Sequence, residues 1–217
     1  MEHTIKAVAF DVDGTILEFT IWPKLHALFN FSMDEDKRLH ALYHEGKLSY
    51  RDWMEEVYGG YLRNGPTRYR AEIEPLMRDF KLVSDAAEVV TELGHRYPLA
   101  LVSSGLMDYA RPVATHLNVA DVYTFTHLIY GEDGAYTGLG YDREGDEILM
   151  KVSALAEWGA KIGVKPSEIA FVGDSVNDLG AFRYTGRGIL KGESTEAMRK
   201  AAWKQISALS ELTDILL

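Results

Sequence analysis

Two aspartates near the start of the chain form the first pattern that suits catalysis. Asp11 and Asp13 belong to the string Asp11-Val12-Asp13-Gly14-Thr15, which follows a short apolar run. In a regular strand both carboxylates would share one face, but a turn at Gly14 can splay them apart. One carboxylate can then attack phosphorus in line, while the other protonates the leaving oxygen and later takes a proton from water. Asp11 lies nearer the strand end, so we expect it to be the nucleophile.

Two later apolar runs also end in polar residues. One ends at Ser103 and Ser104, and the other at a loop that contains Asp174, Asn177 and Asp178. Because parallel strands present their carboxyl ends at one edge of a sheet, we expect the carboxylates of this loop to meet the first two aspartates. Crowded carboxylates repel one another, and a hard divalent cation can hold them ionised. The sequence therefore predicts a Mg²⁺ site.

Phosphoryl transfer also needs groups that compensate the charge on the nonbridging oxygens. Thr15, Ser103 and Lys151 are placed to supply a hydroxyl, backbone amides and an ammonium group. The seven histidines show no convincing ligand array. His40 and His44 are four residues apart, and we interpret this pair as the solvated face of a helix.

The composition is that of an ordinary globular protein. The chain has 217 residues, of which 47% are hydrophobic and 26% charged, enough for one core with a sizeable insertion. The absence of cysteine excludes disulfides, thiolate zinc sites and cysteine nucleophiles. A formal charge of −10 opposes binding to nucleic acid or anionic membranes, so we expect neither partner. The sequence shows no signal-peptide core and no membrane-spanning stretch, which predicts a cytoplasmic protein.

Strands and helices must alternate to bring the polar residues together. Apolar and periodic segments predict strands at 6–10, 99–102, 122–126, 169–172 and 188–190, helices at 50–59, 84–94, 106–117, 146–161 and 176–184, and a hairpin turn at 131–134. This order predicts an α/β fold with a doubly wound, Rossmann-like parallel sheet. Residues 21–81 have helical periodicity instead. We therefore expect a core of residues 1–20 and 82–217 and a helical insertion, residues 21–81, after the first strand.

The motifs together resemble those of the haloacid dehalogenase superfamily, and within it the phosphoserine phosphatase branch. The superfamily pattern of DxDx[TV], a strand ending in Ser or Thr, a lysine and a GDxxxD loop appears here in order. Residues 101–105 resemble the branch's VSGG segment, and residues 173–179 resemble its GDGxNDL loop. Residues 136–138 precede Lys151 much as a TG turn precedes the branch's lysine. The resemblance implies that residues 21–81 form the family's helical cap.

The resemblance also implies a role for each matching residue. Asp11 would be both nucleophile and metal ligand, and Asp13 would be the acid/base that also offers its backbone carbonyl to magnesium. Asp174 would complete the protein's metal ligands. The phosphoryl group would be held by Thr15, Ser103, Ser104 and Lys151. Asn177 and Asp178 would order the loop that contains them, the water molecules bound to the metal, or Lys151.

The departures from the family pattern concern the substrate. Ser104 replaces a glycine, which alters the backbone approach to phosphate. Phosphoserine phosphatases carry a glutamate that pairs with the substrate's amino group, whereas here Thr20 occupies that position and Glu18 lies two positions earlier. Glu18 and Arg51 are the specificity residues we expect. The aromatic residues of the insertion are expected to form its own small core.

The sequence thus predicts a phosphoric monoester hydrolase that resembles phosphoserine phosphatase. We expect a Mg²⁺-dependent enzyme that hydrolyses a small phosphorylated metabolite through an aspartyl phosphate. A phosphomutase would use the same phosphoaspartate but return the group to a sugar. A receiver-like signalling module, or a catalytically inactive phosphate-binding module, would lack turnover. Phosphate release with turnover separates the hydrolase from these alternatives.

Overall fold

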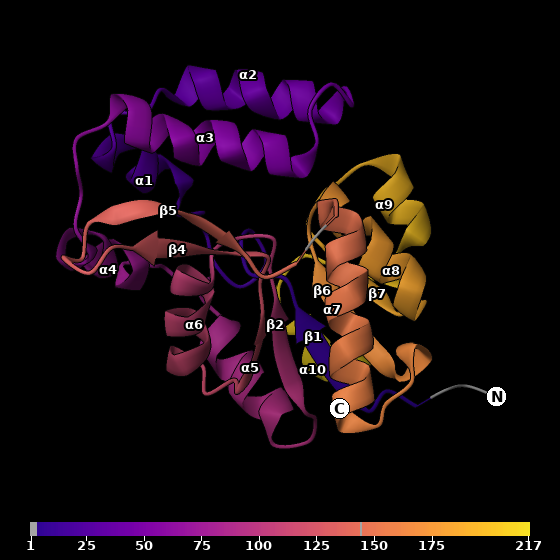
Figure 1. The fold of residues 1–217 in the computed structure, drawn as a ribbon. Coiled ribbons are helices and arrows are strands. Elements are labelled where there is room, and N and C mark those ends of the chain that lie inside the picture. Colours follow the sequence, from indigo (N-terminus) through magenta and orange to yellow (C-terminus); the bar gives the residue numbers. More distant parts are fainter. Residues whose placement is uncertain (1–3, 144) are drawn as a thin grey trace.

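A parallel sheet forms the centre of the protein, whose computed structural model describes residues 4–143 and 145–217. The sheet has six strands in the order β3-β2-β1-β6-β7-β8 (Figure 1). All neighbouring pairs are parallel. The strands are β1 (Ala7–Phe10), β2 (Leu99–Val102), β3 (Asp121–Tyr123), β6 (Ile169–Gly173), β7 (Gly188–Lys191) and β8 (Lys204–Ile206). Because β1 lies between β2 and β6, the loops after these three strands leave the sheet side by side.

Alternate residues of the central strand pack on opposite faces of the sheet. Val8 and Phe10 belong to one buried cluster, and Ala7 and Ala9 belong to the other. The first face is covered by α5 (Ala86–Gly94), α6 (Met107–His116) and α10 (Glu211–Leu216), and the second by α7 (Glu147–Ile162), α8 (Leu179–Thr185) and α9 (Glu196–Ala201). Burial on both faces requires an apolar strand throughout, as β1 is. The predicted doubly wound α/β fold is confirmed.

The sequence did not predict the three elements after β7, namely α9, β8 and α10. Only Ile206 is buried in the edge strand β8, so that segment has no apolar run. Only Met198 is buried in α9, which is six residues long. Elements this short carry too few buried positions to show a period.

A hairpin stands apart from the parallel sheet. It consists of β4 (Thr126–Tyr130) and β5 (Tyr136–Tyr141), which pair antiparallel. The turn predicted at 131–134 is confirmed, with Gly134 at a φ of 82°. The single strand predicted at 122–126 is wrong in its extent, because β3 ends at Tyr123 and residue 126 already belongs to β4. Residues 123–126 are all buried, so the apolar pattern continues through the point where the chain leaves one sheet for the other.

Four helices lie between β1 and α5: α1 (Trp22–Leu28), α2 (Met33–His44), α3 (Tyr50–Asn64) and α4 (Arg70–Arg78). A capping box begins α3, since Ser49 Oγ accepts from the Asp52 amide and Oδ2 of Asp52 accepts from the Ser49 amide, both at 3.1 Å. The sequence predicted that this helix ends near Gly59, but it continues to residue 64. A Cβ at Gly60 would lie 2.4 Å from the ring of Phe31, so this glycine permits close packing and does not break the helix.

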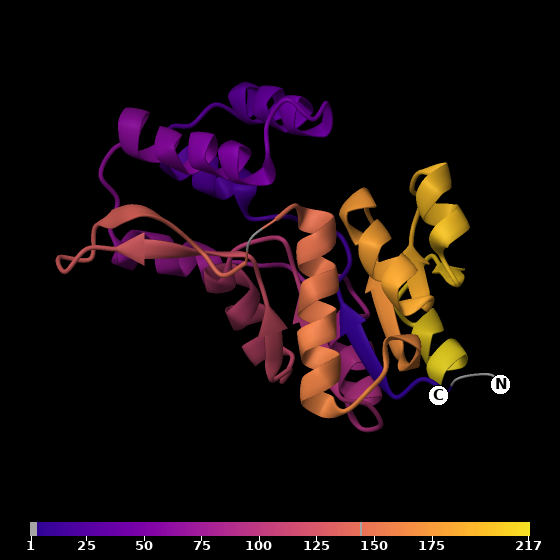
Figure 2. The same ribbon diagram turned by 45° about the vertical axis from the view of Figure 1, so that its right-hand side comes forward.

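Helices α1, α2 and α3 gather above the hairpin in both ribbon views (Figures 1 and 2). The ring of Phe29, which follows α1, lies 5.1 Å from that of Tyr136 in β5. The hairpin therefore supports these helices from below. The division into a core and a cap domain stays a prediction. Within residues 4–143 and 145–217, no helix is both long and apolar enough to cross a membrane.

Candidate active site

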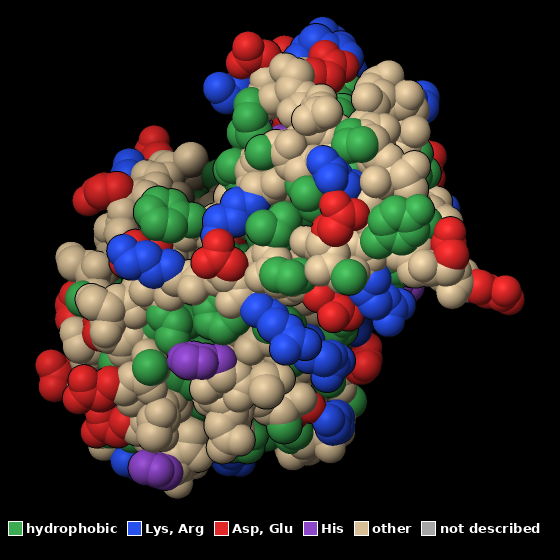
Figure 3. Space-filling view, turned by 90° about the vertical axis from the view of Figure 1, so that its left-hand side faces the viewer, with side chains coloured by type: hydrophobic (Ala, Val, Ile, Leu, Met, Phe, Trp, Pro, Cys, Tyr) green, Lys and Arg blue, Asp and Glu red, His purple; other side chains and the backbone are tan. Residues whose placement is uncertain are grey.

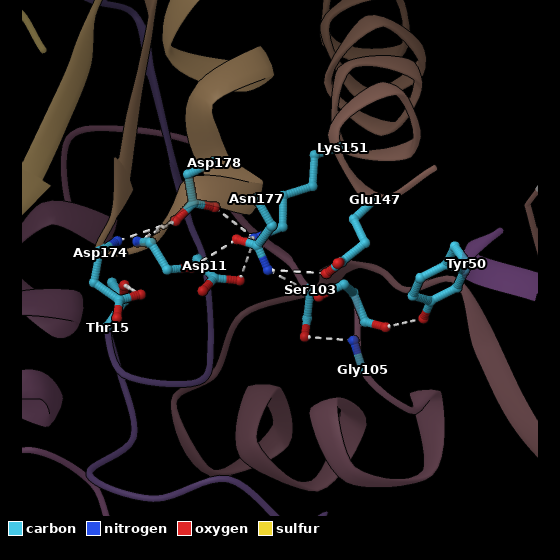
Figure 4. Close-up of polar contacts among 12 residues, drawn as sticks. Asp11, Thr15, Tyr50, Ser103, Gly105, Glu147, Lys151, Asp174, Asn177 and Asp178 are labelled. Atoms are coloured by element: carbon cyan, nitrogen blue, oxygen red, sulfur yellow. Dashed lines mark hydrogen bonds and ion pairs between the residues drawn. The ribbon is translucent and has the colours of Figure 1, made fainter. Parts of the chain in front are cut away.

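Polar residues that follow β1, β2 and β6 lie close together at the carboxyl edge of the sheet (Figure 4). Asp11 follows β1, Ser103 follows β2 and Asp174 follows β6. The Asp11 amide still donates to the carbonyl of Val172 at 2.9 Å, so the neighbouring strand fixes the backbone of the expected nucleophile. The structure thus brings together residues that are far apart in the sequence.

Lys151 is fully buried at the centre of this group. Its Nζ donates to Oδ1 of Asp11 at 2.7 Å, to Oδ1 of Asp178 at 2.5 Å and to Oδ1 of Asn177 at 3.1 Å. Burial alone would lower the pKa of Lys151, but the charges of Asp11 and Asp178 raise the pKa above its usual value. The ammonium group therefore stays protonated next to the expected nucleophile.

Asp178 orders the loop that follows β6. Its Oδ2 accepts from the amides of Asp174 at 3.0 Å and Ser175 at 3.1 Å, while its Oδ1 binds Lys151. Residues 176–178 form a 3₁₀ turn before α8, where the sequence predicted one continuous helix. A Cβ at Gly173 would lie 2.4 Å from Oδ2 of Asp178, so the tight loop needs glycine there.

Asp13 has the properties of a proton donor. Burial raises the pKa of Asp13 to about 7, with the charge of Lys151 opposing this shift and that of Asp174 adding to it. A carboxyl group with this pKa can both give and take a proton near neutral pH. Its Oδ1 is buried, and no hydrogen-bond partner for it exists among the described residues. A buried carboxyl oxygen of this kind is placed to bind a substrate group or water.

Gly14 lets the chain that follows β1 turn toward Asp174, which follows β6. It has a φ of 78°, and a Cβ at this position would lie 2.4 Å from Oδ2 of Asp174. Any side chain would therefore push Asp174 away from the end of β1. The turn expected at this glycine is present.

The donors present suit a hard divalent cation. Carboxylate oxygens of Asp11, Asp174 and Asp178 lie within 4.8 Å of one another. Both oxygens of Asp178 are engaged by the loop amides and Lys151, which leaves Asp11 and Asp174 as the side chains best able to hold a metal. Asp13, expected to contribute only its backbone carbonyl, is not a member of this carboxylate group. Burial, followed by the charge of Asp178, raises the pKa of Asp174, while the charge of Lys151 opposes this shift.

The predicted phosphate-binding hydroxyls have partners within the site. Thr15 Oγ1 donates to Oδ1 of Asp174 at 3.3 Å. Oγ of Ser103 accepts from the Gly105 amide at 3.0 Å. Oγ of Ser104 accepts from Nδ2 of Asn177 at 3.2 Å, and its carbonyl accepts from the Tyr50 hydroxyl at 2.8 Å. The Ser104 contacts join the loop after β6 to α3.

Two charged residues of the site escaped the sequence analysis. Glu147 is buried, and its Oε2 accepts from Nδ2 of Asn177 at 3.2 Å. An acidic residue in the first turn of a helix is common, so the sequence offered no signal for it. Nζ of Lys191 donates to the carbonyl of Gly14 at 2.9 Å. Lys191 ends β7, and its place at a strand end was a signal that could have been used.

A cleft of about 460 Å³ opens beside the carboxylates. Its lower wall includes Asp11 and Asp13, and its upper wall includes Trp22, Tyr50 and Trp53 from α1 and α3. Asp36, Lys37, His40 and His44 of α2 also line it. As expected for core aromatic residues, Tyr50 belongs to the buried hydrophobic cluster and Trp22 and Trp53 pack against it. All three also line the cleft.

The two expected specificity residues are engaged elsewhere. Glu18 forms an ion pair with Lys81 at 2.6 Å. Arg51 forms one with Glu55 at 2.8 Å and lies over the ring of Tyr141 at 4.5 Å. Neither Glu18 nor Arg51 is among the described residues that line the cleft.

A second hollow lies on another part of the surface, lined by residues of α4, α6 and β4, Arg78, Arg111 and Leu128 among them. The side of the molecule that carries α4 and the hairpin shows hydrophobic and charged side chains interspersed (Figure 3). At about 700 Å³ the hollow is larger than the cleft. Asp108 is the one carboxylate among the described residues that line this hollow, and it accepts a hydrogen bond from the Leu128 amide at 2.8 Å. The described lining therefore contains no pair of carboxylates like Asp11 and Asp13.

Comparisons with known proteins agree with this geometry. The family model described as haloacid dehalogenase-like hydrolase matches residues 5–186. A phosphoserine phosphatase of Archaeoglobus fulgidus is 26% identical over 185 residues, which cover 85% of this chain and 52% of that protein, so the chain spans about half of its length. A phosphoglycolate phosphatase of Chromobacterium violaceum is 26% identical over 232 aligned residues, covering 98% of this chain and 96% of that protein.

The fold also has close counterparts among solved structures. One is a phosphoserine phosphatase solved as an analogue of its phospho-aspartyl intermediate, with a TM-score of 0.79 and 20% identity; the match covers 99% of this chain and 100% of that one. At this identity the likeness shows the fold alone. The family match spans most of the chain, so the protein belongs to the haloacid dehalogenase-like hydrolases and is similar, within them, to the phosphoserine phosphatase branch.

Proposed function

We propose that the protein hydrolyses a small phosphomonoester through a phosphorylated Asp11. The observation that carries this proposal is the direct contact of Asp11 with the buried ammonium group of Lys151 at 2.7 Å. The contact fixes the orientation of the carboxylate and places positive charge where the phosphoryl oxygens would gather. The phosphatase relatives support the same chemistry.

Two half-reactions follow from the positions of the carboxyl groups. In the first, a carboxylate oxygen of Asp11 forms a bond to phosphorus, the ester bond breaks, and Asp13 gives its proton to the leaving alkoxide. In the second, Asp13 takes a proton from water, whose oxygen attacks phosphorus and releases Asp11 and phosphate. The pKa of Asp13, raised to about 7 by burial, suits both directions of proton transfer.

Asp11 and Asp174 would hold Mg²⁺, with the backbone carbonyl of Asp13 as a further ligand. The ion would supply positive charge that polarises a phosphoryl oxygen. Thr15 keeps Asp174 in place, and Asp178 holds both the loop and Lys151. Ser103 lies at the end of β2, where its hydroxyl is available to the phosphoryl group as a donor.

The test is phosphate release from a panel of phosphomonoesters with Mg²⁺ and with chelator, using the wild type and Asp11→Asn. The asparagine is nearly isosteric with aspartate but a poor nucleophile. We expect Mg²⁺-dependent turnover in the wild type and none in the variant. Substantial turnover by pure, folded Asp11→Asn would overturn the assignment of the nucleophile. Transfer to a sugar without net phosphate release would identify a mutase.

A further inference from the structure

We propose that the preferred substrate carries a planar ring on its leaving group, bound against an aromatic wall formed by Trp22, Tyr50 and Trp53. This inference rests on the proposed phosphatase function and names the substrate class of the same site. Both tryptophans are half-buried and Tyr50 is buried, with 4% of its surface exposed, and all three residues line the cleft above Asp11. A cleft of about 460 Å³ lies within the range of pockets that hold ligands of several rings.

The indole of Trp53 is fixed before any ligand arrives. Its Nε1 donates to Oδ1 of Asp36 at 3.2 Å, which anchors one edge of the ring. One face stacks on Tyr43, with ring centroids 5.3 Å apart and an angle of 21° between the planes. His40 packs against the same indole at 4.9 Å. Because the ring loses little freedom on binding, a planar ligand can pack at low entropic cost against the part of the indole that lines the cleft.

Trp22 gives the wall a second fixed ring from a different helix. It meets Tyr58 edge to face, with centroids 5.9 Å apart, and Tyr58 is buried in the core of the insertion. The Tyr50 hydroxyl donates to the carbonyl of Ser104 at 2.8 Å, so its ring is held next to the loop that follows β2. The aromatic wall therefore extends from the carboxyl edge of the sheet along α1 and α3.

The polar groups beside this wall suit a neutral ring substituent. Nε2 of His40 and Nε2 of His44 lie 2.8 Å apart, a contact in which one ring donates and the other accepts. Burial and the neighbouring His44 lower the pKa of His40, although Glu147 and Asp36 oppose the shift. The Nδ1 atoms of this pair can meet a hydroxyl, carbonyl or ring nitrogen of the substrate.

A small zwitterion such as phosphoserine finds few partners in this cleft. Among the described residues that line it, Lys37 is the one lysine or arginine, and it lies exposed beside Asp34 at 3.8 Å. The acids Asp36 and Glu147 already accept from Trp53 and Asn177. The carboxylate of such a substrate would therefore lose water without gaining a buried cation as a partner.

The first experiment compares kcat/KM for two sets of phosphomonoesters in the presence of Mg²⁺. The ring-bearing set is pyridoxal 5′-phosphate, phosphotyrosine and uridine 5′-monophosphate. The other set is phosphoserine, phosphoglycolate, glycerol 3-phosphate and phosphocholine. We expect the best ring-bearing ester to exceed the best of the others by at least roughly tenfold, the scale of one good aromatic contact. Equal or better hydrolysis of an aliphatic ester overturns the proposal that the substrate carries a planar ring. If that ester is phosphocholine, the aromatic wall binds a cation instead.

This panel tests the phosphatase function and the preference for a ring separately. Turnover of aliphatic esters alone removes the ring inference and leaves the phosphatase function standing. Absence of turnover on all seven compounds counts against both. The panel therefore distinguishes a wrong substrate class from a wrong reaction.

The second experiment changes the wall itself. Trp53→Ala should reduce the ratio of ring-bearing to aliphatic kcat/KM roughly tenfold, mainly through KM, and Trp53→Phe should restore much of it. The matched control is Trp203→Ala, because Trp203 packs beside Arg187 and Lys204 and is not among the described residues that line the cleft. The control should keep the wild-type ratio. If Trp53→Ala is folded but keeps the wild-type ratio, Trp53 does not bind the leaving group.

Discussion

Nζ of Lys151 lies 2.7 Å from Oδ1 of Asp11, although the two residues are 140 positions apart in the chain. Helix α7 packs against the sheet and delivers the lysine to the end of β1, where Asp178 holds the same ammonium group. Neither the lysine nor the two carboxylates could be buried alone at reasonable cost. In the proposed mechanism, folding and catalysis therefore depend on the same three charges.

Lys151→Met should lose both activity and stability. The variant leaves Asp11 and Asp178 buried without their cation, which we expect to cost about 3–5 kcal/mol in the free energy of unfolding. Turnover should fall at least roughly 100-fold, because a donor to the phosphoryl oxygens is gone. Urea unfolding and phosphate release measure the two effects. The matched control is Lys161→Met, an exposed position on the same helix whose partner is Asp121. Similar losses in both variants would contradict a special role for Lys151.

Asp13→Asn should slow hydrolysis in a manner that depends on the leaving group. The amide cannot protonate the departing alkoxide, so kcat for an alkyl phosphate should fall roughly 10²–10⁴-fold. Nitrophenyl phosphate has a leaving group that departs without a proton, so its phosphorylation step should suffer much less. Rapid-mixing kinetics with both esters measure that step directly. An equal loss for the two esters would show that Asp13 does not act as the acid.

Removal of a carboxylate should stabilise the metal-free protein. Burial and the charge of Asp178 raise the pKa of Asp174, which means that its charged form is disfavoured in the fold. Asp174→Asn should therefore raise the Tm measured in chelator. Mg²⁺ should raise the Tm of the wild type but have little effect on this variant, because a ligand is lost. A variant that responds to Mg²⁺ as the wild type does would exclude Asp174 from the metal site.

Asp36 should stabilise the protein at neutral pH and lose this effect in acid. Burial alone would raise the pKa of Asp36, but His26 and the Trp53 indole lower it below the ordinary value of 3.8. Because the pKa of Asp36 is depressed in the folded state, its carboxylate stabilises the fold fully above pH 3.8. This stabilisation disappears as the pH falls through the folded-state pKa. The difference in unfolding free energy between wild type and Asp36→Asn should shrink accordingly below pH 3.8.

The control for this effect lies on the same helix. Asp34 is exposed, and its ion pair with Lys37 has a distance of 3.8 Å. Asp34→Asn should therefore change stability little at any pH. A wild-type advantage over Asp36→Asn that grows in acid would show that the pKa is raised instead.

The sequence by itself determined the strands and turns that carry local signals. Residues 7–10 and 169–173 are apolar throughout because each strand is buried on both faces, and the polar residues after them mark the carboxyl edge. The capping box at Ser49 and the turn at Gly134 are likewise complete within a few residues. Such features depend on neighbours along the chain, so a pattern search finds them.

Only the tertiary structure decided which side chains share the cleft. Glu147 opens a helix as many acidic residues do, and its contact with Asn177 exists only because α7 and the loop after β6 meet. Trp53 has the spacing of a core aromatic residue, yet it lines the cleft because Asp36 and Tyr43 hold it there. These contacts join residues from different helices and loops, and their energies depend on distance and burial, which one-dimensional spacing does not encode.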